Sequence, residues 1–128
     1  MKKFFLSLFI AGLLWTCQSQ SETPDYGVLT PVEFQKVVDS NKEIILLDVR
    51  TPAEFANGRI EGAVNVDIQS PGFLDEIRKL DKEGEYAVYC AVGRRSAFAI
   101  NEMKKLGFTK LYDLGGGYNA WVNLAREK

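Results

Sequence analysis

Short apolar runs alternate with helix-like segments along most of this chain. Continuous runs of apolar and β-branched residues are typical of strands covered on both faces. Five such runs occur, at residues 27–29, 44–49, 63–66, 86–89 and 111–114. The segments between them predict helices that begin near Thr30, Thr51, Ser70 and Ser96, and a short helix that contains Trp121. Strands that alternate with helices in this way predict a parallel α/β sheet with helices on both faces.

Two of the predicted helix starts carry the same capping signature. Residues 30–33 and 51–54 each place a threonine at the N-cap, a proline at the first helical position and a glutamate that closes a capping box. The second helix is expected to be short, because Asn57-Gly58 is typical of a helix that ends with a left-handed residue.

The first residues have the pattern of a targeting segment. Met1-Lys2-Lys3 is a short cationic start, and residues 4–15 form an apolar run that suits the core of a signal peptide but is too short to span a bilayer. Two endings fit. Residues 14–17 resemble a bacterial lipobox, in which Cys17 carries the lipid, whereas residues 19–21 offer the small side chains of ordinary signal peptidase cleavage. The lipoprotein ending is favoured.

We therefore expect a signal peptide at residues 1–16, a flexible tether at residues 17–26 and a folded domain at residues 27–126. The protein is then exported, in the periplasm or anchored to the bacterial cell envelope, and meets the membrane only through its signal or lipid anchor. Removal of residues 1–16 takes away two of the 16 basic residues and none of the 17 acidic ones, which changes the net charge from −1 to −3.

Composition excludes several classes of function. The sequence contains no histidine, which excludes Ser-His-Asp and Cys-His catalysis and most zinc sites. It also lacks a basic stripe, so nucleic acid is not an expected partner, and nothing in it implies a metal or an organic cofactor. Lipidation or removal of Cys17 leaves Cys90 as the one thiol of the sequence, so an intramolecular disulfide is excluded.

The strongest chemical signal is a seven-residue segment that follows the strand at residues 86–89 and opens the next helix. It consists of Cys90, Ala91, Val92, Gly93, Arg94, Arg95 and Ser96. A strand fixes the sulfur, while loop amides and a helix N-terminus supply positive potential that lowers a thiol pKa and cradles an anion. Gly93 is expected to adopt a positive φ or to approach the sulfur closely. The alternative is a buried, inert core cysteine.

Three features meet at one edge of the predicted sheet. Asp48 and Cys90 each end a strand, and Gly115–Gly117 follow the last one. In parallel α/β sheets, ligands bind beyond the carboxyl ends of the strands. The triple glycine has the look of a phosphate cradle, but it lacks the lysine and hydroxyl residue of a P-loop, which favours a tight turn beside the cysteine loop.

In order and spacing, these motifs resemble those of single-domain rhodaneses. Residues 90–96 fit the pattern C-x-x-G-x-R-S, and residues 48–65 fit D-x-R-x-x-x-E-F/Y-x-x-G-H-I-x-G-A-x-N, with Arg59 where the family usually has histidine. Residues 113–117 with Trp121 fit the C-terminal signature, so the resemblance covers residues 28–124. It implies a three-layer α/β/α sandwich with a five-stranded parallel sheet, in an exported bacterial form.

The resemblance implies a sulfurtransferase that works through a Cys90 persulfide. A small anionic donor such as thiosulfate, or a persulfide, supplies the sulfur, and cyanide, a thiol or a protein cysteine accepts it. From Cys90 to Arg95 the loop has six residues, one fewer than in related dual-specificity phosphatases and arsenate reductases, which favours a sulfur atom over a phosphoryl group. The alternatives are a phosphatase, arsenate reductase or other thiol reductase on the same scaffold, and a binding module without catalysis.

The two loop arginines are expected to differ in role. Arg94 faces solvent and attracts the anionic donor, or it is only a solvated surface charge. Arg95 matches the family's fixed arginine and braces the loop through a carboxylate, for which Asp48 and Glu54 are the candidates. Arg50 and Glu54, four residues apart, are instead expected to pair with each other if they only fix the turn between strand and helix.

Overall fold

The computed structural model describes residues 26–128, so the predicted signal peptide, Cys17 and nearly all of the predicted tether lie outside the described residues. Strands and helices alternate through the whole of the described part. The elements are β1 Tyr26–Leu29, α1 Pro31–Ser40, β2 Ile45–Asp48, α2 Pro52–Ala56, β3 Val64–Asn65, α3 Phe73–Arg78, β4 Glu85–Tyr89, α4 Arg94–Lys105, β5 Lys110–Leu114 and α5 Gly117–Arg126.

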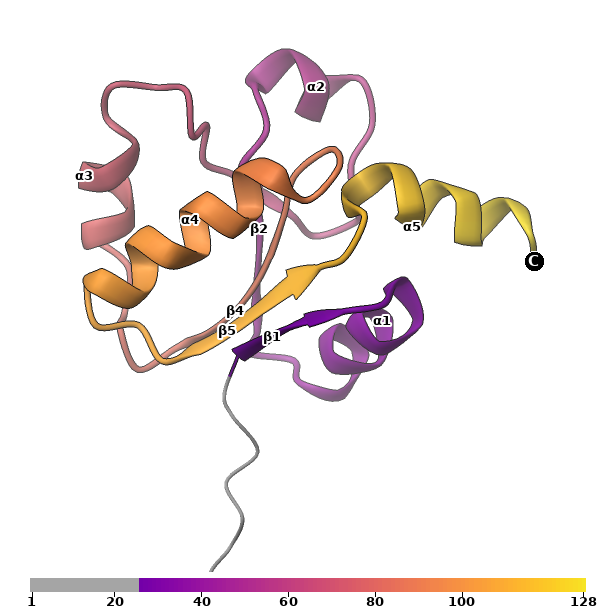
Figure 1. The fold of residues 1–128 in the computed structure, drawn as a ribbon, viewed down its shortest axis with the longest axis horizontal. Coiled ribbons are helices and arrows are strands. Elements are labelled where there is room, and N and C mark those ends of the chain that lie inside the picture. Colours follow the sequence, from indigo (N-terminus) through magenta and orange to yellow (C-terminus); the bar gives the residue numbers. More distant parts are fainter. Residues whose placement is uncertain (1–25) are drawn as a thin grey trace, which may run out of the picture.

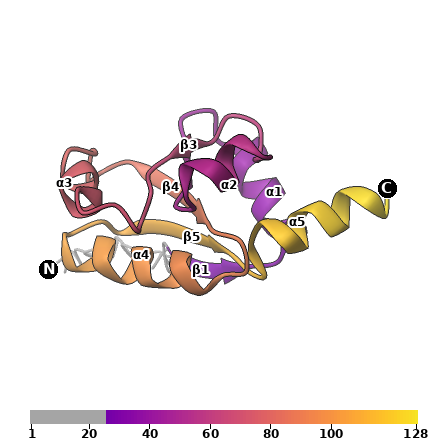
Figure 2. The ribbon, with the colours of Figure 1, turned by 90° about the horizontal axis from the view of Figure 1, so that it is seen from above.

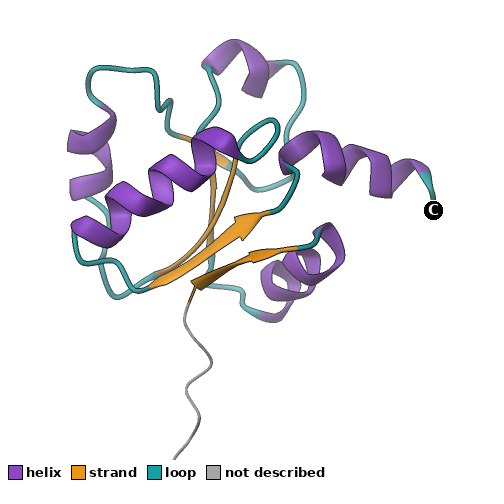
Figure 3. Cartoon of the chain, viewed as in Figure 1, coloured by secondary structure: helices purple, strands orange, loops and turns teal. Residues whose placement is uncertain are grey.

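The sheet confirms the predicted five parallel strands. Their order is β1-β5-β4-β2-β3, and every neighbouring pair is parallel. Helices α3 and α4 lie on one face of the sheet and α1 and α5 on the other, which gives the predicted three layers (Figures 1 and 2). The loops that follow the carboxyl ends of β4 and β5 come together at the start of α4 and α5 (Figure 3).

One hydrophobic cluster packs on each face of the sheet, because successive strand residues point to opposite faces. The face under α3 and α4 buries Leu47, Tyr86, Val88, Cys90 and Leu111. The face under α1 and α5 buries Leu46, Ala87, Tyr89 and Leu114. Cys90 therefore belongs to the α4 side of the sheet, two residues beyond Val88 and on the same side of the strand.

Both predicted capping boxes form. The Thr30 amide donates to Glu33 Oε2 at 2.9 Å, and the Thr51 amide donates to Glu54 Oε2 at 2.9 Å, while each threonine hydroxyl accepts from the glutamate amide at 3.3 Å. The short helix α2 ends at Ala56, and Gly58 takes a positive φ of 147°. Within the described residues, no helix has the length and apolar character that a membrane crossing requires.

Several element boundaries differ from the predictions, and those of β3, α3 and α4 are the ones that need an explanation. Strand β3 has two residues, and α3 begins at Phe73 rather than near Ser70, because Ser70 forms a turn that accepts the amides of Gly72 and Phe73. Helix α4 begins at Arg94, two residues before the predicted start at Ser96. The left-handed Gly93 at its N-cap, with φ 100°, turns the chain directly into the helix.

Candidate functional site

The sulfur of Cys90 lies at the carboxyl end of β4 and is enclosed by the loop that follows. Cys90 is 1% exposed. The Gly93 amide donates to Cys90 Sγ at 3.1 Å, and the Cys90 thiol donates to the Ser96 hydroxyl at 3.5 Å. Gly93 thus has both predicted properties, a positive φ and a close approach of its backbone to the sulfur. The loop therefore curves around the sulfur, with polar groups of Gly93 and Ser96 directed at it.

The environment of Cys90 favours the thiolate. Burial by itself raises the pKa of the thiol, but hydrogen bonds from the hydroxyl and amide of Ser96 and from the amides of Gly93 and Val92 outweigh it, so the pKa is lowered from the ordinary value of 9.0. A thiolate is the nucleophilic form of cysteine. This environment argues against the inert core cysteine considered from the sequence.

The first turn of α5 holds the cysteine loop from behind. The Tyr118 amide donates to the Cys90 carbonyl at 2.8 Å, and the Asn119 amide donates to the Ala91 carbonyl at 3.1 Å. Gly117 makes this approach feasible, because a Cβ atom there would lie 2.5 Å from the Ala91 carbonyl oxygen. The structure therefore places the triple glycine in the tight turn beside the loop, the arrangement that the sequence favoured.

Arg95 braces the loop through Glu54. Its Nη1 and Nη2 donate to the two carboxylate oxygens of Glu54 at 2.8 and 2.7 Å, a bidentate pair between α4 and α2. These bonds, with those from Thr51, outweigh burial and lower the pKa of Glu54 to about 2. Glu54 raises the pKa of Arg95 in return. Of the two carboxylates considered as partners of Arg95, the structure selects Glu54.

Asp48 pairs with Arg50 instead, so the prediction that Arg50 pairs with Glu54 was wrong. Arg50 Nη2 lies 2.6 Å from Asp48 Oδ2 and also donates to the Gly58 carbonyl at 2.6 Å. The guanidinium lies 4.3 Å from the centre of the Tyr118 ring. Asp48 precedes Arg50 by only two positions and is buried beside it, whereas Glu54 closes its own capping box. Asp48 and Arg50 therefore anchor α5 beneath the loop.

The outer residues of the loop face solvent. Arg94 is exposed as the first residue of α4, and Val92 is 62% exposed. The early start of α4 puts Arg94 in the first helical turn, where it faces solvent as expected. Arg59, which stands where the family usually has histidine, is exposed, and its guanidinium lies over the Phe55 ring.

Two side chains behind the loop were not anticipated from the sequence. Asp113 in β5 is 5% exposed, and one of its carboxylate oxygens has no hydrogen-bond partner among residues 26–128. Tyr89 is fully buried, and its hydroxyl accepts the Ile60 amide at 3.1 Å. A charged residue two positions after Leu111, and so on the same buried face of the strand, was the available signal for Asp113.

The arrangement holds a nucleophilic sulfur beside amides and a helix N-terminus, with one exposed arginine at the rim. In the described part of the chain, no group of three or more cysteine, aspartate and glutamate side chains could hold a metal ion. Fold and site together define a parallel α/β domain with a buried cysteine loop beyond the carboxyl end of a strand, where sheets of this type bind their ligands.

The rhodanese-like domain family matches residues 30–124 of the chain. The chain therefore belongs to the rhodanese-like domain family, and the family and fold expected from the sequence are confirmed. A crystal structure of a rhodanese-related protein from Thermoplasma volcanium is similar, with 29% identity and a TM-score of 0.67 over 77% of this chain and 93% of that one.

Several relatives have sulfurtransferase names. The chain is 35% identical over 90 residues to a sulfurtransferase of Allochromatium vinosum, covering 69% of this chain and 79% of that protein. It is 34% identical over 96 residues to the probable adenylyltransferase/sulfurtransferase MoeZ of Mycobacterium tuberculosis, covering 75% of this chain. The matched region is 24% of the length of MoeZ.

Proposed function

We propose that the protein is a sulfurtransferase that moves sulfane sulfur from thiosulfate or a persulfide to a thiophilic acceptor through a persulfide on Cys90. The single observation that carries the proposal is the enclosure of the sulfur: an amide of the six-residue loop lies 3.1 Å from Cys90 Sγ. The six-residue length of the loop favours one added sulfur atom over a phosphoryl group. The sulfurtransferase names of the relatives support the same class of reaction.

In the first half-reaction, the Cys90 thiolate attacks the outer sulfur of the donor. A sulfur–sulfur bond forms to Cys90, and the bond to the donor breaks, so that sulfite or a thiolate leaves with the electron pair. In the second half-reaction, cyanide, a thiol or a protein cysteine attacks the outer sulfur and restores the Cys90 thiolate. Because the two substrates react in turn, ping-pong kinetics follow.

Three groups of the site serve this reaction. The Gly93 amide and the Ser96 hydroxyl stabilise the thiolate before the attack and after the discharge. The exposed charge of Arg94 draws an anionic donor to the rim. The Arg95–Glu54 pair keeps the first turn of α4, and with it the loop amides, in place.

Intact-mass measurement tests the proposal. The full chain is incubated with thiosulfate and then with cyanide, with Cys90→Ser run in parallel as the matched control. We expect a gain of one sulfur atom on the wild type alone, which cyanide removes. The absence of a gain with thiosulfate and with a persulfide donor would refute the sulfurtransferase proposal. Turnover of a phosphate ester or arsenate would then identify the alternative enzyme, and failure there would favour a binding module.

We extend the proposal to location. The cationic start, the apolar residues 4–15 and the lipobox-like residues 14–17 support export with a lipid on Cys17. Expression of the full chain in a bacterium, followed by fractionation and mass measurement, tests this. A lipid-modified N-terminal Cys17 in the membrane fraction is expected, and Cys17→Ala is expected to abolish it. An unmodified protein that begins near residue 20 would show ordinary cleavage instead.

A further inference from the structure

A cavity of about 310 Å³ lies between β1 and α4, apart from the cysteine loop. Helix α4 packs on β4 and β5, and it leaves Val28 of the edge strand 73% exposed. Because Gly27 adds no side chain, the space between the helix and the edge strand is not filled. The proposed reaction gives no task to any of the lining residues, which are Gly27, Val28, Ala97, Ile100, Lys104 and Asp113.

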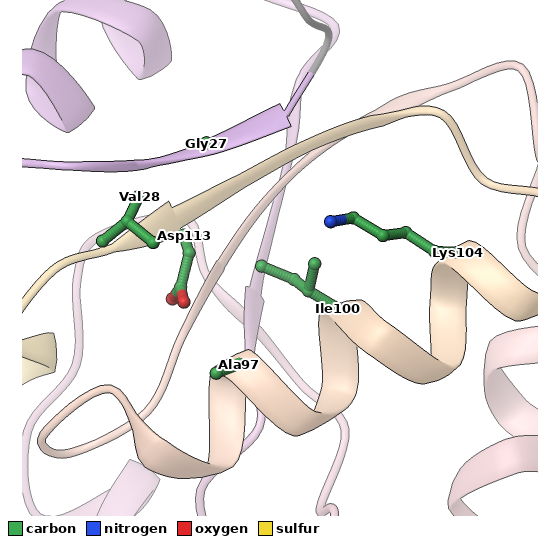
Figure 4. Close-up of a pocket in the computed structure, with 6 residues that line it drawn as sticks. All are labelled: Gly27, Val28, Ala97, Ile100, Lys104 and Asp113. Atoms are coloured by element: carbon green, nitrogen blue, oxygen red, sulfur yellow. The ribbon is translucent and has the colours of Figure 1, made fainter.

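Asp113 places a buried carboxyl group in the wall of this cavity. The carboxyl projects from β5 toward Ala97 on α4 (Figure 4). In the register of the sheet, Asp113 stands between Val28 of β1 and Val88 of β4, so its neighbours on that face are apolar. Asp113 is 5% exposed, and its Oδ1 has no hydrogen-bond partner within residues 26–128. A carboxylate oxygen in this state is costly.

A cation that reaches the carboxyl from the cavity would offset this cost. The negative charge of a carboxylate is shared by its two oxygens, so a positive group beside either of them stabilises both. Burial raises the pKa of Asp113 above its ordinary value of 3.8, and an ammonium group beside the carboxyl would lower the pKa again. The ionised carboxyl and a bound cation therefore favour each other.

The rest of the cavity is apolar up to a second charged group. Figure 4 shows Ile100 between the Asp113 carboxyl and the ammonium group of Lys104. Ala97 and Lys104 are two helical turns apart on α4, about 10 Å along its axis, and the Lys104 side chain reaches back toward the carboxyl (Figure 4). The cavity thus carries a negative group at one end, a positive group at the other and apolar side chains between them.

We infer that this cavity binds a short linear molecule with an ammonium group at one end, an anionic group at the other and an apolar chain between them. The ammonium group donates to the Asp113 carboxyl, and the chain lies against Val28 and Ile100. The anionic group lies at Lys104, at the rim. An ω-amino carboxylate has this chemistry. The inference goes beyond the proposed function, because the cavity is separate from the loop that holds Cys90.

Other classes of ligand fit these residues less well. A calcium ion takes about six to eight oxygen ligands, and among residues 26–128 no group of three or more metal-ligating side chains comes together. A molecule that is only anionic would bring a like charge to Asp113 if it filled the cavity. Lys104 already interacts within the protein, but an ammonium group has three N–H donors, so it is able to donate to a ligand as well.

A nuclear magnetic resonance titration of the isotope-labelled full chain with δ-aminovalerate tests the inference. We expect saturable shifts of the amide resonances of the lining residues. Valerate, which lacks the ammonium group, is expected to bind about tenfold more weakly or worse, because it makes no charge-assisted bond to Asp113. Pentylamine, which lacks only the anionic group, is expected to lose up to about fivefold, since Lys104 is exposed.

Three variants locate the binding. Asp113→Asn is expected to remove the advantage of δ-aminovalerate over valerate. Ala97→Leu keeps the carboxyl but fills the cavity from the exposed side of α4, and it is expected to abolish the shifts. Glu102→Gln, the same carboxyl-to-amide change on α4 outside the lining, is expected to bind as the wild type does.

The inference is overturned if δ-aminovalerate gives no saturable shifts at the lining residues, or if valerate binds equally well to the wild type. Wild-type affinity in Ala97→Leu would overturn it too, and this result does not depend on whether Asp113→Asn folds. The titration contains no sulfur donor, so failure of the sulfurtransferase proposal leaves its outcome unchanged.

Discussion

The closest contact behind the cysteine loop gives the sharpest prediction, the substitution Gly117→Ala. Gly117 has φ 63°, and an added Cβ atom would lie 2.5 Å from both the carbonyl carbon and oxygen of Ala91 and 2.6 Å from the Cys90 carbonyl oxygen. Ordinary contact begins at 3.4 Å. The loop and the start of α5 must therefore separate, by roughly 0.9 Å if neither atom yields in another direction, a displacement of the size that costs an active site about 100-fold in rate.

The energetic effect has two parts. An alanine in the left-handed region costs about 1–2 kcal/mol. The separation also breaks or lengthens the bonds from Tyr118 and Asn119 to the loop carbonyls, which are 2.8 and 3.1 Å long. At about 0.5–1.5 kcal/mol for each bond, the loss of unfolding free energy amounts to about 2–5 kcal/mol in all.

Gly62→Ala is the matched control. Gly62 has φ 83°, so alanine meets the same backbone strain, but no heavy atom lies within 4 Å of the added Cβ. Urea unfolding is expected to show a loss of about 1–2 kcal/mol for Gly62→Ala, with sulfur loading of Cys90 unchanged. For Gly117→Ala we expect the larger loss, and loading from thiosulfate that is slower by about 100-fold.

The comparison of the two variants shows whether the effect of Gly117→Ala comes from the contact between α5 and the loop or from backbone strain alone. Loading at the wild-type rate in Gly117→Ala would refute the idea that α5 holds the loop at its working position. Equal losses of stability in the two variants would show that only backbone strain is at stake.

Three other predictions concern charge. Glu54→Gln is expected to cost about 1 kcal/mol in urea unfolding at pH 7, because it disrupts a bidentate pair whose side chains are 25% and 35% exposed. The pKa of Glu54, about 2 in place of 4.5, gives the wild type stability that is present above pH 4.5 and lost as the pH falls toward 2, and the variant should lack this acid loss. Arg94→Ala is expected to raise the KM for thiosulfate by up to about fivefold and to flatten its salt dependence with kcat unchanged, since an exposed charge contributes at most about 1 kcal/mol; unchanged KM and salt dependence would leave Arg94 a mere surface charge. Burial raises the pKa of Asp113 above 3.8, so its contribution to stability is complete below pH 3.8 and lost as the pH rises through the folded-state pKa; Asp113→Asn should unfold without that decline, and an unaltered pH profile would contradict the assigned burial cost.

Local signals in the sequence were sufficient for the elements and for the position of the cysteine. The capping boxes at Thr30 and Thr51 depend on residues three apart, and the strand-to-loop transition at Cys90 depends on the apolar run directly before it. Short-range patterns of this kind survive folding because the partners are neighbours in the chain.

Local sequence patterns could not predict which carboxylate pairs with which arginine. Arg95 and Glu54 are 41 residues apart in the chain, and only the packing of α2 beside α4 joins them. Asp48 competed for the same arginine, but it lies two residues from Arg50 and is buried with it. The start of α4 was missed for a related reason: two consecutive arginines carry no apolar periodicity, whereas the geometry of Gly93 decides where the helix begins.

The position of Asp113 in the last strand could not be predicted from the sequence either. The register of β4 and β5 places Asp113 on the face of the sheet that holds Cys90 and Ser96. A sequence pattern identifies an acidic residue in a strand, but it does not say which oxygen lacks a partner.

The 1% exposure of Cys90 decides which molecules this sulfur is able to meet. A disulfide between two copies of the chain requires Cβ atoms about 3.5–4.5 Å apart, a separation that the enclosing loops of two proteins prevent, so the resting thiol is protected from dimerisation by oxidation. In the loaded form that we propose, the added sulfur stands about 2 Å further out. A large acceptor would then react with the outer sulfur of the persulfide form, but it would not reach the buried thiol of the unloaded form. The difference in accessibility alone would therefore direct sulfur from this protein to the acceptor.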